Sequence, residues 1–268
     1  MKIYIPTRDR VNAQFTWDNL GPVLQPFTTL VCPAEEVQSH LDKGRNAIAR
    51  PPVRLAHVRQ WLVDEAVKRG EGHLPIIMCD DDLAFFVRKS PEAHNLRPAG
   101  PDVYEIFQRL YNYVLAGPEV HAGLSPRQGN NWSYPDIVEY INRMNAIHCV
   151  LPNALHHYNI RYDEVDMMED YHVTLSLFER GERNITIQDA AWDQCKGSGA
   201  PGGFSHYRTK ETQADAANKL AELHPLTVKT VLKNPATGAG GFTGERLDVR
   251  VQWKKAYTTG TRNPTFTR

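Results

Sequence analysis

The sequence predicts an α/β protein with a Rossmann-like, mostly parallel central sheet flanked by helices. Three short runs rich in β-branched and aromatic residues, at 2–6, 27–33 and 74–79, alternate with segments of helical periodicity. This rhythm is typical of parallel sheets, in which helices connect neighbouring strands. Ligands of such sheets bind beyond the carboxyl ends of the strands, and three consecutive aspartates follow the third strand.

The first strand, KIYIP, ends at a proline, and a polar loop then leads into a helix that carries Phe15, Trp17 and Leu20. A short helix is expected after the second strand, and apolar spacing over 52–70 predicts a longer one before the third. The later expected elements are a helix at 103–117, strands at 119–125 and 146–152, a helix at 169–181, a strand at 184–189 and a helix around 211–223. We expect the chain after Trp253 to be disordered or peripheral.

The composition is that of an ordinary soluble globular protein, with 41% hydrophobic and 23% charged residues. No apolar run approaches the roughly 20 residues of a membrane span, and the N-terminus does not resemble a signal peptide. Four widely spaced cysteines favour reduced thiols in the cytoplasm over a disulfide frame or a zinc site. Since 31 basic residues balance 31 acidic ones, contact with a polyanion would need a local basic patch.

Asp80, Asp81 and Asp82 lie between two apolar runs in the stretch LPIIMCDDDLAFFVR. Carboxylates this close repel one another, so a fold that packs around them favours a shared cation. A short turn can direct two of the three side chains to one point while the third turns away. Carboxylate oxygens suit Mg²⁺ or Mn²⁺, which commonly also bind substrate phosphates. An exposed acidic turn is the alternative, but the apolar flanks favour a metal site.

The start IYIPTRDR, a helix with an arginine and a strand that ends in Asp-x-Asp resemble nucleotide-sugar-dependent glycosyltransferases with the A-type fold. The resemblance implies that the proline–threonine loop holds the nucleotide base and that Asp80 and Asp82 ligate a Mn²⁺ or Mg²⁺ ion at the diphosphate of a UDP-sugar. The implied nucleotide-sugar-binding residues are Pro6, Thr7, Arg8, Arg59, Asp80, Asp81 and Arg208.

A second acidic pair, Glu169 and Asp170 in MMEDYHVTL, resembles the motif that opens a helix beneath the acceptor in these enzymes. One of the two acids would be the general base, which must lie within hydrogen-bond reach of the acceptor hydroxyl. We expect Asp170 to have this role, with Glu169 as the second choice. Both acids could instead simply cap the helix, since carboxylates stabilise its first turn.

A late histidine often completes the metal site of this fold, and the resemblance implies His206 in PGGFSHYR. The glycines before it allow close approach to phosphates. His172 is the alternative ligand, although a histidine on a helix beside the acidic pair could equally be packed. Tyr207 and Arg208 would contact the diphosphate if this loop closes over the site.

The same motifs, together with GLSPRQGNNW at 123–132, resemble the phage TET-associated glycosyltransferases over about residues 1–210. That resemblance implies DNA as the acceptor, at 5-hydroxymethylcytosine made by a TET-like oxygenase, and a phage enzyme in the cytoplasm of its bacterial host. Arg127, Asn131 and Trp132 would bind this acceptor through polar donors and a stacking ring.

Two other functions remain open: a metal-dependent phosphodiesterase or nuclease, and a non-catalytic nucleotide- or carbohydrate-binding module.

For a glycosyltransferase, we expect residues 1–125 to be the nucleotide-sugar-binding half of one domain. Residues 126–253 would be its acceptor-binding and catalytic half, and 254–268 a C-terminal tail. A run of arginines would add a basic face for DNA, although an ordinary charged helix face is an equally common reading of it: Arg45, Arg50, Arg54 and Arg59.

Overall fold

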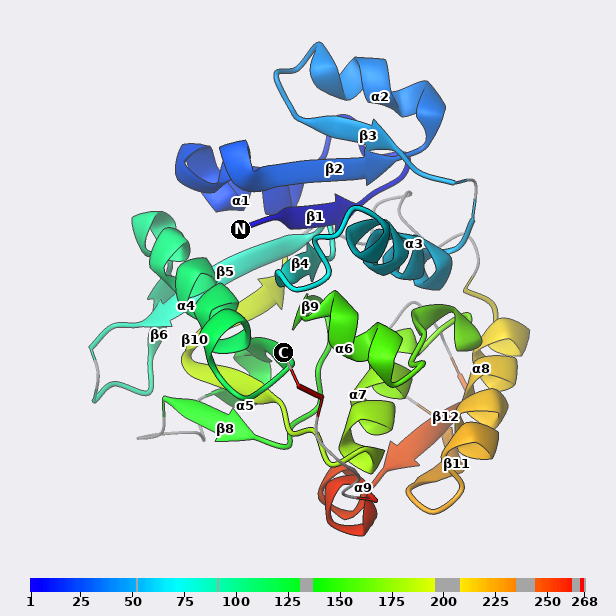
Figure 1. Cartoon of the computed structure of the whole chain (residues 1–268). Helices are drawn as coiled ribbons and strands as arrows, with labels where there is room; N and C mark the ends of the chain where they lie inside the picture. Colours follow the sequence, from blue (N-terminus) through cyan, green and yellow to red (C-terminus); the bar gives the residue numbers. More distant parts are fainter. Residues whose placement is uncertain are drawn as a thin grey trace.

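The computed structural model describes residues 1–51, 53–90, 92–130, 137–195, 208–234, 244–261 and 266–267. A large sheet runs through the molecule with helices around it, so the predicted α/β class is confirmed (Figure 1). In the described ranges this sheet has ten strands, in the order β3-β2-β1-β4-β9-β7-β10-β5-β6, with β8 paired to β10. None of the helices described is long and apolar enough to span a membrane.

The first four strands pair in parallel: β1 (Ile3–Pro6), β2 (Thr28–Cys32), β3 (Ala47–Ala49) and β4 (Ile76–Cys79). Strands β1, β2 and β4 were predicted from the sequence, and the short strand β3 was missed. They are connected through α1 (Phe15–Leu24), η1 (Gln25–Phe27), α2 (Ala34–Leu41) and α3 (Leu55–Lys68). Strands β1 and β4 are neighbours, with Ile3 opposite Ile77. The loops that follow these two strands therefore start side by side at the carboxyl edge of the sheet.

The rest of the sheet comprises β5 (Leu83–Arg88), β6 (Leu96–Pro98), β7 (His121–Pro126), β8 (Val138–Tyr140), β9 (Ile147–Val150) and β10 (Ile185–Gln194). Of their pairings, β7–β10 is parallel and the others are antiparallel. Strand β10 is longer than predicted, and its register with β7 shifts between Ile187 and Ala191. The aspartate turn leads from β4, inside the sheet, to β5 near the far edge.

Further helical elements are η2 (Gly100–Asp102), α4 (Val103–Ala116), α5 (Arg127–Asn130), α6 (Pro152–His157), η3 (Tyr162–Glu164) and α7 (Glu169–Glu179). Helix α4 illustrates how they pack, because its buried residues recur every three or four positions: Val103, Ile106, Phe107, Leu110 and Val114. Phe107 and Tyr162 are among the largest fully buried side chains of the main core.

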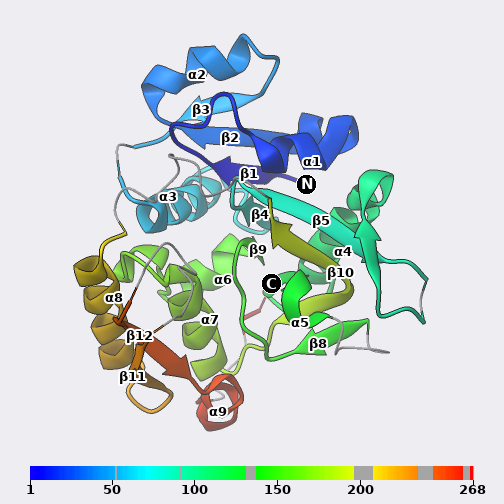
Figure 2. The ribbon, with the colours of Figure 1, turned by 180° about the vertical axis from the view of Figure 1, so that it is seen from behind.

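The C-terminal segment forms a smaller layer beside α7 (Figures 1 and 2). It contains α8 (Lys210–Leu223), the antiparallel pair β11 (Val228–Lys233) and β12 (Arg246–Val251), and α9 (Trp253–Thr259). The prediction of a disordered or peripheral tail after Trp253 is wrong for α9. Ala256 is fully buried, and the rings of Trp253 and Tyr257 pack edge-on against Phe178 of α7.

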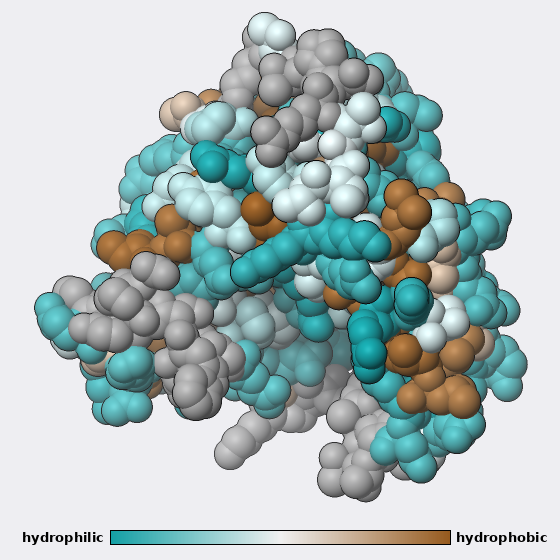
Figure 3. Space-filling model, turned by 90° about the horizontal axis from the view of Figure 1, so that it is seen from below, coloured by the Kyte–Doolittle hydropathy of each residue, from teal (hydrophilic) through white to brown (hydrophobic). Residues whose placement is uncertain are grey.

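One face of the molecule is mostly hydrophilic, with hydrophobic side chains in small separate groups (Figure 3). The large hydrophobic residues exposed over the described surface come from many different elements: Val23, Phe27, Leu41, Leu115, Ile137, Tyr140, Leu226 and Leu232. Single exposed residues of this kind are normal for a folded protein. The polar edge beyond β1 and β4 is therefore the better place to look for function.

Candidate active site

The loops after β1 and β4 meet, as the sequence predicted. The Thr7 hydroxyl donates a hydrogen bond to Asp81 at 2.6 Å, and Arg10 Nη1 lies 2.5 Å from the other Asp81 carboxylate oxygen. Arg10 also lies 3.8 Å from Asp82. All four side chains are buried. Asp81 therefore ties the two loops together, and the carboxylates of its two neighbours flank this anchor.

Arg59 of α3 connects the aspartate turn to the start of α7. Its guanidinium group donates to Asp80 at 2.7 Å and to Glu169 at 2.8 Å, and its side chain is almost fully buried. Burial disfavours the charge on Arg59, but the two carboxylates more than offset this, so its pKa lies above the ordinary value. The two acidic motifs of the sequence thus share one positively charged side chain, that of Arg59.

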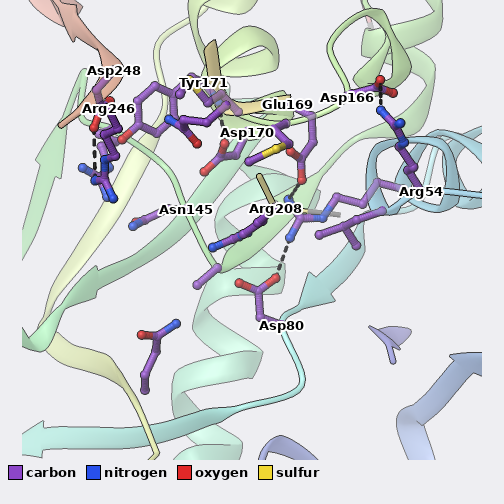
Figure 4. A pocket seen from close by; sticks show the side chains of 18 of the residues that line it. Arg54, Asp80, Asn145, Asp166, Glu169, Asp170, Tyr171, Arg208, Arg246 and Asp248 are labelled. Carbon is purple, nitrogen blue, oxygen red and sulfur yellow. Dashed lines mark hydrogen bonds and ion pairs between the residues drawn. The ribbon is translucent and has the colours of Figure 1, made fainter. Parts of the chain in front are cut away.

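A pocket of about 350 Å³ opens over this ion pair (Figure 4). Its lining comes from α3, the aspartate turn, the loop before β9, the start of α7, β10, α8 and β12. The charged lining residues are Asp80, Asp166, Glu169, Asp170, Asp248, Arg54, Arg59, Arg143, Arg208 and Arg246, and the aromatic ones are Tyr171 and Trp192. A polar cleft with several guanidinium groups suits a phosphorylated ligand.

Glu169 and Asp170 begin α7, and Met168 before them has a left-handed backbone with φ 63°. Such a conformation is uncommon for a residue other than glycine and clusters at functional sites. Both acids line the pocket, but Glu169 is buried against Arg59 and Asp170 is partly accessible. Burial and the charge of Glu169 raise the pKa of Asp170 to about 7, against the opposing effect of nearby arginines. Asp170 is therefore suited to accept a proton near neutral pH.

Asp80 and Asp82 have the chemistry to hold a divalent cation. Burial and the charges of Asp80 and Asp81 raise the pKa of Asp82 to about 7, although Arg10 acts in the opposite direction. A cation beside these carboxylates would relieve that repulsion. Across the described ranges there is no group of three or more His, Cys, Asp or Glu side chains placed to hold one ion. Two carboxylates completed by substrate phosphates are, however, a common arrangement for Mg²⁺.

Other residues predicted for the site lie beside the pocket rather than in its lining. Pro6 and Thr7 are buried next to the aspartate turn, and Arg8 follows them in a partly exposed position. Arg127 begins α5, where its guanidinium group lies 4.3 Å from the centroid of the Phe86 ring. Arg208, by contrast, lines the pocket. The binding roles of these residues stay predictions.

Four predicted residues fall outside the described ranges: Asn131, Trp132, His206 and Tyr207. His172, the alternative metal ligand, is buried, and its Nδ1 lies 3.0 Å from Nε2 of His224. Burial lowers the pKa of His172 to about 4. This contact favours a packing role for His172.

The arginine run does not form the basic face that the sequence suggested. Arg45 and Arg50 donate hydrogen bonds to backbone carbonyl groups, and Arg50 is buried. Arg54 is ion-paired with Asp166, and Arg59 is the buried bridge described above. The prediction is wrong because these guanidinium groups satisfy acceptors within the fold, which the spacing of arginines along the chain does not reveal.

Sequence reasoning missed the loop at 141–146. Ile141 and Ala146 near its ends both have left-handed backbones with φ 59°. The loop presents Arg143 and Asn145 to the pocket. For a β-branched residue this conformation is strained, so the surrounding structure must hold the loop in place. No periodic pattern in the sequence singles out these residues.

A second missed feature is the pocket wall formed by α8 and β12. Gln213, Arg246 and Asp248 contribute to it. Arg246 Nη2 lies 3.2 Å from the Asp248 carboxylate, which Lys233 Nζ approaches to 3.1 Å. The two-residue spacing in β12 puts Arg246 and Asp248 on the same side of the strand, which was the one sign of them in the sequence.

Comparison with known proteins supports the resemblance noted in the sequence. No curated protein matches the chain significantly. A mannose-1-phosphate geranyltransferase from Thermus thermophilus is similar in structure, with a TM-score of 0.43 and 11% sequence identity over 72% of this chain and 75% of that one. The family model of the TET-associated glycosyltransferases matches residues 1–203. The chain therefore belongs to the TET-associated glycosyltransferase family and is a glycosyltransferase.

Proposed function

We propose that the enzyme moves a sugar from a UDP-sugar to the hydroxyl group of 5-hydroxymethylcytosine in DNA, with the help of Mn²⁺ or Mg²⁺. The observation that carries the proposal is the bridge from Asp80 through Arg59 to Glu169. It joins a donor-type acidic turn to an acceptor-type acidic pair within one polar pocket. Such an arrangement can bring a donor and an acceptor hydroxyl into contact.

Asp170 is the general base of this proposal. Asp170 lines the pocket, and its raised pKa matches proton transfer near neutral pH. The acceptor O–H proton passes to Asp170 while the acceptor oxygen forms a bond to the anomeric carbon of the donor. The bond from that carbon to the diphosphate breaks, and UDP leaves. Glu169 is the weaker candidate for the base, because Arg59 already holds its carboxylate at 2.8 Å.

Asp80 and Asp82 would hold the metal ion, with His206 as a predicted further ligand. When bound, the metal supplies positive charge that stabilises the departing diphosphate. Arg59 keeps Asp80 in position at 2.7 Å, and Arg208, which lines the pocket, would bind a phosphate oxygen. Pro6, Thr7 and Arg8 remain the predicted contacts of the nucleotide base of the donor.

Two parts of the proposal rest on family resemblance alone. The acceptor base would be made by a TET-like oxygenase acting before this enzyme, and both would work in the cytoplasm of the phage's host. The division into a donor half at 1–125 and an acceptor half at 126–253 is kept as an expectation. The phosphodiesterase and binding-module alternatives are disfavoured, because the family is one of glycosyltransferases.

The test is UDP release from a panel of UDP-sugars with Mn²⁺, with and without duplex DNA that contains 5-hydroxymethylcytosine. Digested nucleosides are weighed by mass spectrometry in parallel. A gain of one sugar mass on the modified base would support both donor and acceptor. Metal-dependent UDP release without this gain would reject the acceptor, and no release from any donor would reject the donor class.

A pair of variants tests the metal site in the same assay. Asp82→Ala should abolish turnover, and Asp42→Ala, at an exposed position after α2, should not change it. Chelation of the metal with EDTA should stop the wild-type enzyme, and added Mn²⁺ should restore it. Full activity of Asp82→Ala would reject the metal assignment.

A further inference from the structure

The C-terminal wall of the pocket lies outside the part of the chain that the family model matches, residues 1–203. Arg208, Gln213, Arg246 and Asp248 nevertheless line the same pocket as the acidic pair. The segment is anchored on α7 by a core of its own, in which Phe178 and Ala256 are fully buried. The helix that carries Asp170 thus also supports this wall.

Within this wall, Arg246 and Asp248 lie apart from Asp80, where the donor is expected, and Arg208 lies closer to Asp80 (Figure 4). In Figure 4, Arg246 and Asp248 stand on one side of Glu169 and Asp170, and Arg54 stands on the other. Because the donor is expected at the carboxyl edge of β1 and β4, a ligand on the side of Arg246 and Asp248 would be the acceptor. Its hydroxyl group would then reach Asp170 from that side.

The charges on this side favour an anion. Asp248 is approached by both Lys233 and Arg246, at 3.1 and 3.2 Å, so the cluster keeps an excess positive charge. Arg143 is exposed and lies 5.1 Å from the centroid of the Tyr171 ring. Within the ranges that the structure describes, no carboxylate lies within 4 Å of the Arg143 guanidinium group.

We propose that Arg143 and Arg246 bind phosphates of the acceptor DNA strand beside the target nucleotide. The inference rests on the proposed function and adds the residues that select a nucleic acid over a free nucleoside. Arg143 comes from the strained loop at 141–146, and Asp248 fixes Arg246, so both guanidinium groups are pre-positioned. Guanidinium groups bind phosphate oxygens in a bidentate way, and such contacts set register on the strand without reading its sequence.

The test measures binding separately from turnover. Affinity for a fluorescent duplex with one 5-hydroxymethylcytosine is measured by anisotropy between about 50 and 200 mM salt, where each phosphate contact contributes a slope of about −0.9 in log K against log salt. Affinity for UDP with Mn²⁺ is measured by calorimetry. The variants are Arg143→Gln, Arg246→Gln and Arg246→Lys. The matched control is Arg180→Gln, an exposed arginine at the opposite end of α7.

Each glutamine variant should reduce the salt slope by about one and weaken DNA binding roughly tenfold at the lowest salt, with UDP affinity unchanged. Arg246→Lys should keep most of the slope, because it keeps the charge. All variants should unfold at the wild-type temperature. A loss of DNA binding could then not be due to unfolding of the C-terminal segment. Glutamine variants that bind DNA like the wild type would overturn the inference, and so would a loss of UDP affinity, which would place these arginines at the donor diphosphate.

Sugar transfer measured on the same samples distinguishes the two proposals. If the glutamine variants lose DNA binding as expected but the wild type transfers no sugar to DNA, the proposed acceptor is wrong while the assignment of the two arginines to DNA phosphates stands. If the wild type glycosylates a free nucleoside but has no affinity for DNA, the arginine assignment is wrong.

Discussion

Arg59→Met tests whether the buried guanidinium group holds the site together. The substitution keeps an unbranched, apolar side chain and removes the guanidinium group with its charge. It leaves Glu169 buried without its partner at 2.8 Å and Asp80 without its partner at 2.7 Å. The two lost contacts are expected to lower the free energy of unfolding by very different amounts, because the two carboxylates differ in exposure to solvent.

The Glu169 side chain is 8% exposed and that of Arg59 3%, so their contact is a buried ion pair. Removal of one partner from such a pair costs about 3–5 kcal/mol, since it leaves an uncompensated buried charge. The Asp80 side chain is 34% exposed, and solvent screening reduces its contribution to about 0–1 kcal/mol. We expect Arg59→Met to lower the free energy of unfolding by about 4 kcal/mol, a large share of the total stability of a typical domain.

The assay is urea denaturation followed by tryptophan fluorescence, with the double variant Arg59→Met/Glu169→Gln measured beside the single one. The double variant should regain much of the lost stability, because a neutral amide needs no counter-charge. Arg161→Met is the control, since it removes an arginine whose ion pairs are partly exposed and should cost at most about 1 kcal/mol. The reasoning is refuted if Arg59→Met loses less than about 1 kcal/mol, or if the double variant is less stable than the single one.

Three other predictions concern single groups of the site and its support. Asp170 must be ionised to accept a proton, so kcat/KM should rise with pH through about 7. The variant Asp170→Asn should lose roughly 10²–10⁴-fold in kcat. A kcat/KM that does not change with pH in the wild type would contradict the assignment of Asp170 as the base. At pH 8 the charge of Asp82 is disfavoured by burial beside two other carboxylates. The neutral variant Asp82→Asn should therefore be at least as stable as the wild type while it loses turnover. A clearly lower unfolding temperature of the variant would contradict this. His172 stays neutral in the folded protein because burial lowers its pKa from 6.5 to about 4, so stability should fall by up to about 3 kcal/mol as the pH drops from 6.5 to 4. His172→Gln should flatten that part of the stability curve, and an unchanged slope would show that another group titrates there.

Local patterns were sufficient to predict the longer helices, the strands β1, β2, β4, β7, β9 and β10, and the two acidic motifs. They did not predict β3, β5, β6, β8, β11 or β12. The sequence displays these patterns directly, because they involve residues only a few positions apart. Examples are the apolar residues of α4, which recur every three or four positions, and the β-branched runs of β1, β2 and β4. The meeting of the loops after β1 and β4 followed from the rule that parallel strands share one carboxyl edge. The tail after Trp253 was misjudged, since the burial of Ala256 depends on α7, far away in the sequence.

What the tertiary structure decided was which charges face one another. Arg59 and Glu169 are 110 residues apart, and nothing in their local sequence distinguishes their buried pair from the backbone contacts of Arg45. The wall with Arg246 was equally hidden, because β12 reaches the pocket through packing on α7 and α8. The sequence by itself determined the elements and the family, since both depend on residues close together along the chain. The assembly of the pocket required the fold, because its charges are brought together by core packing between distant segments.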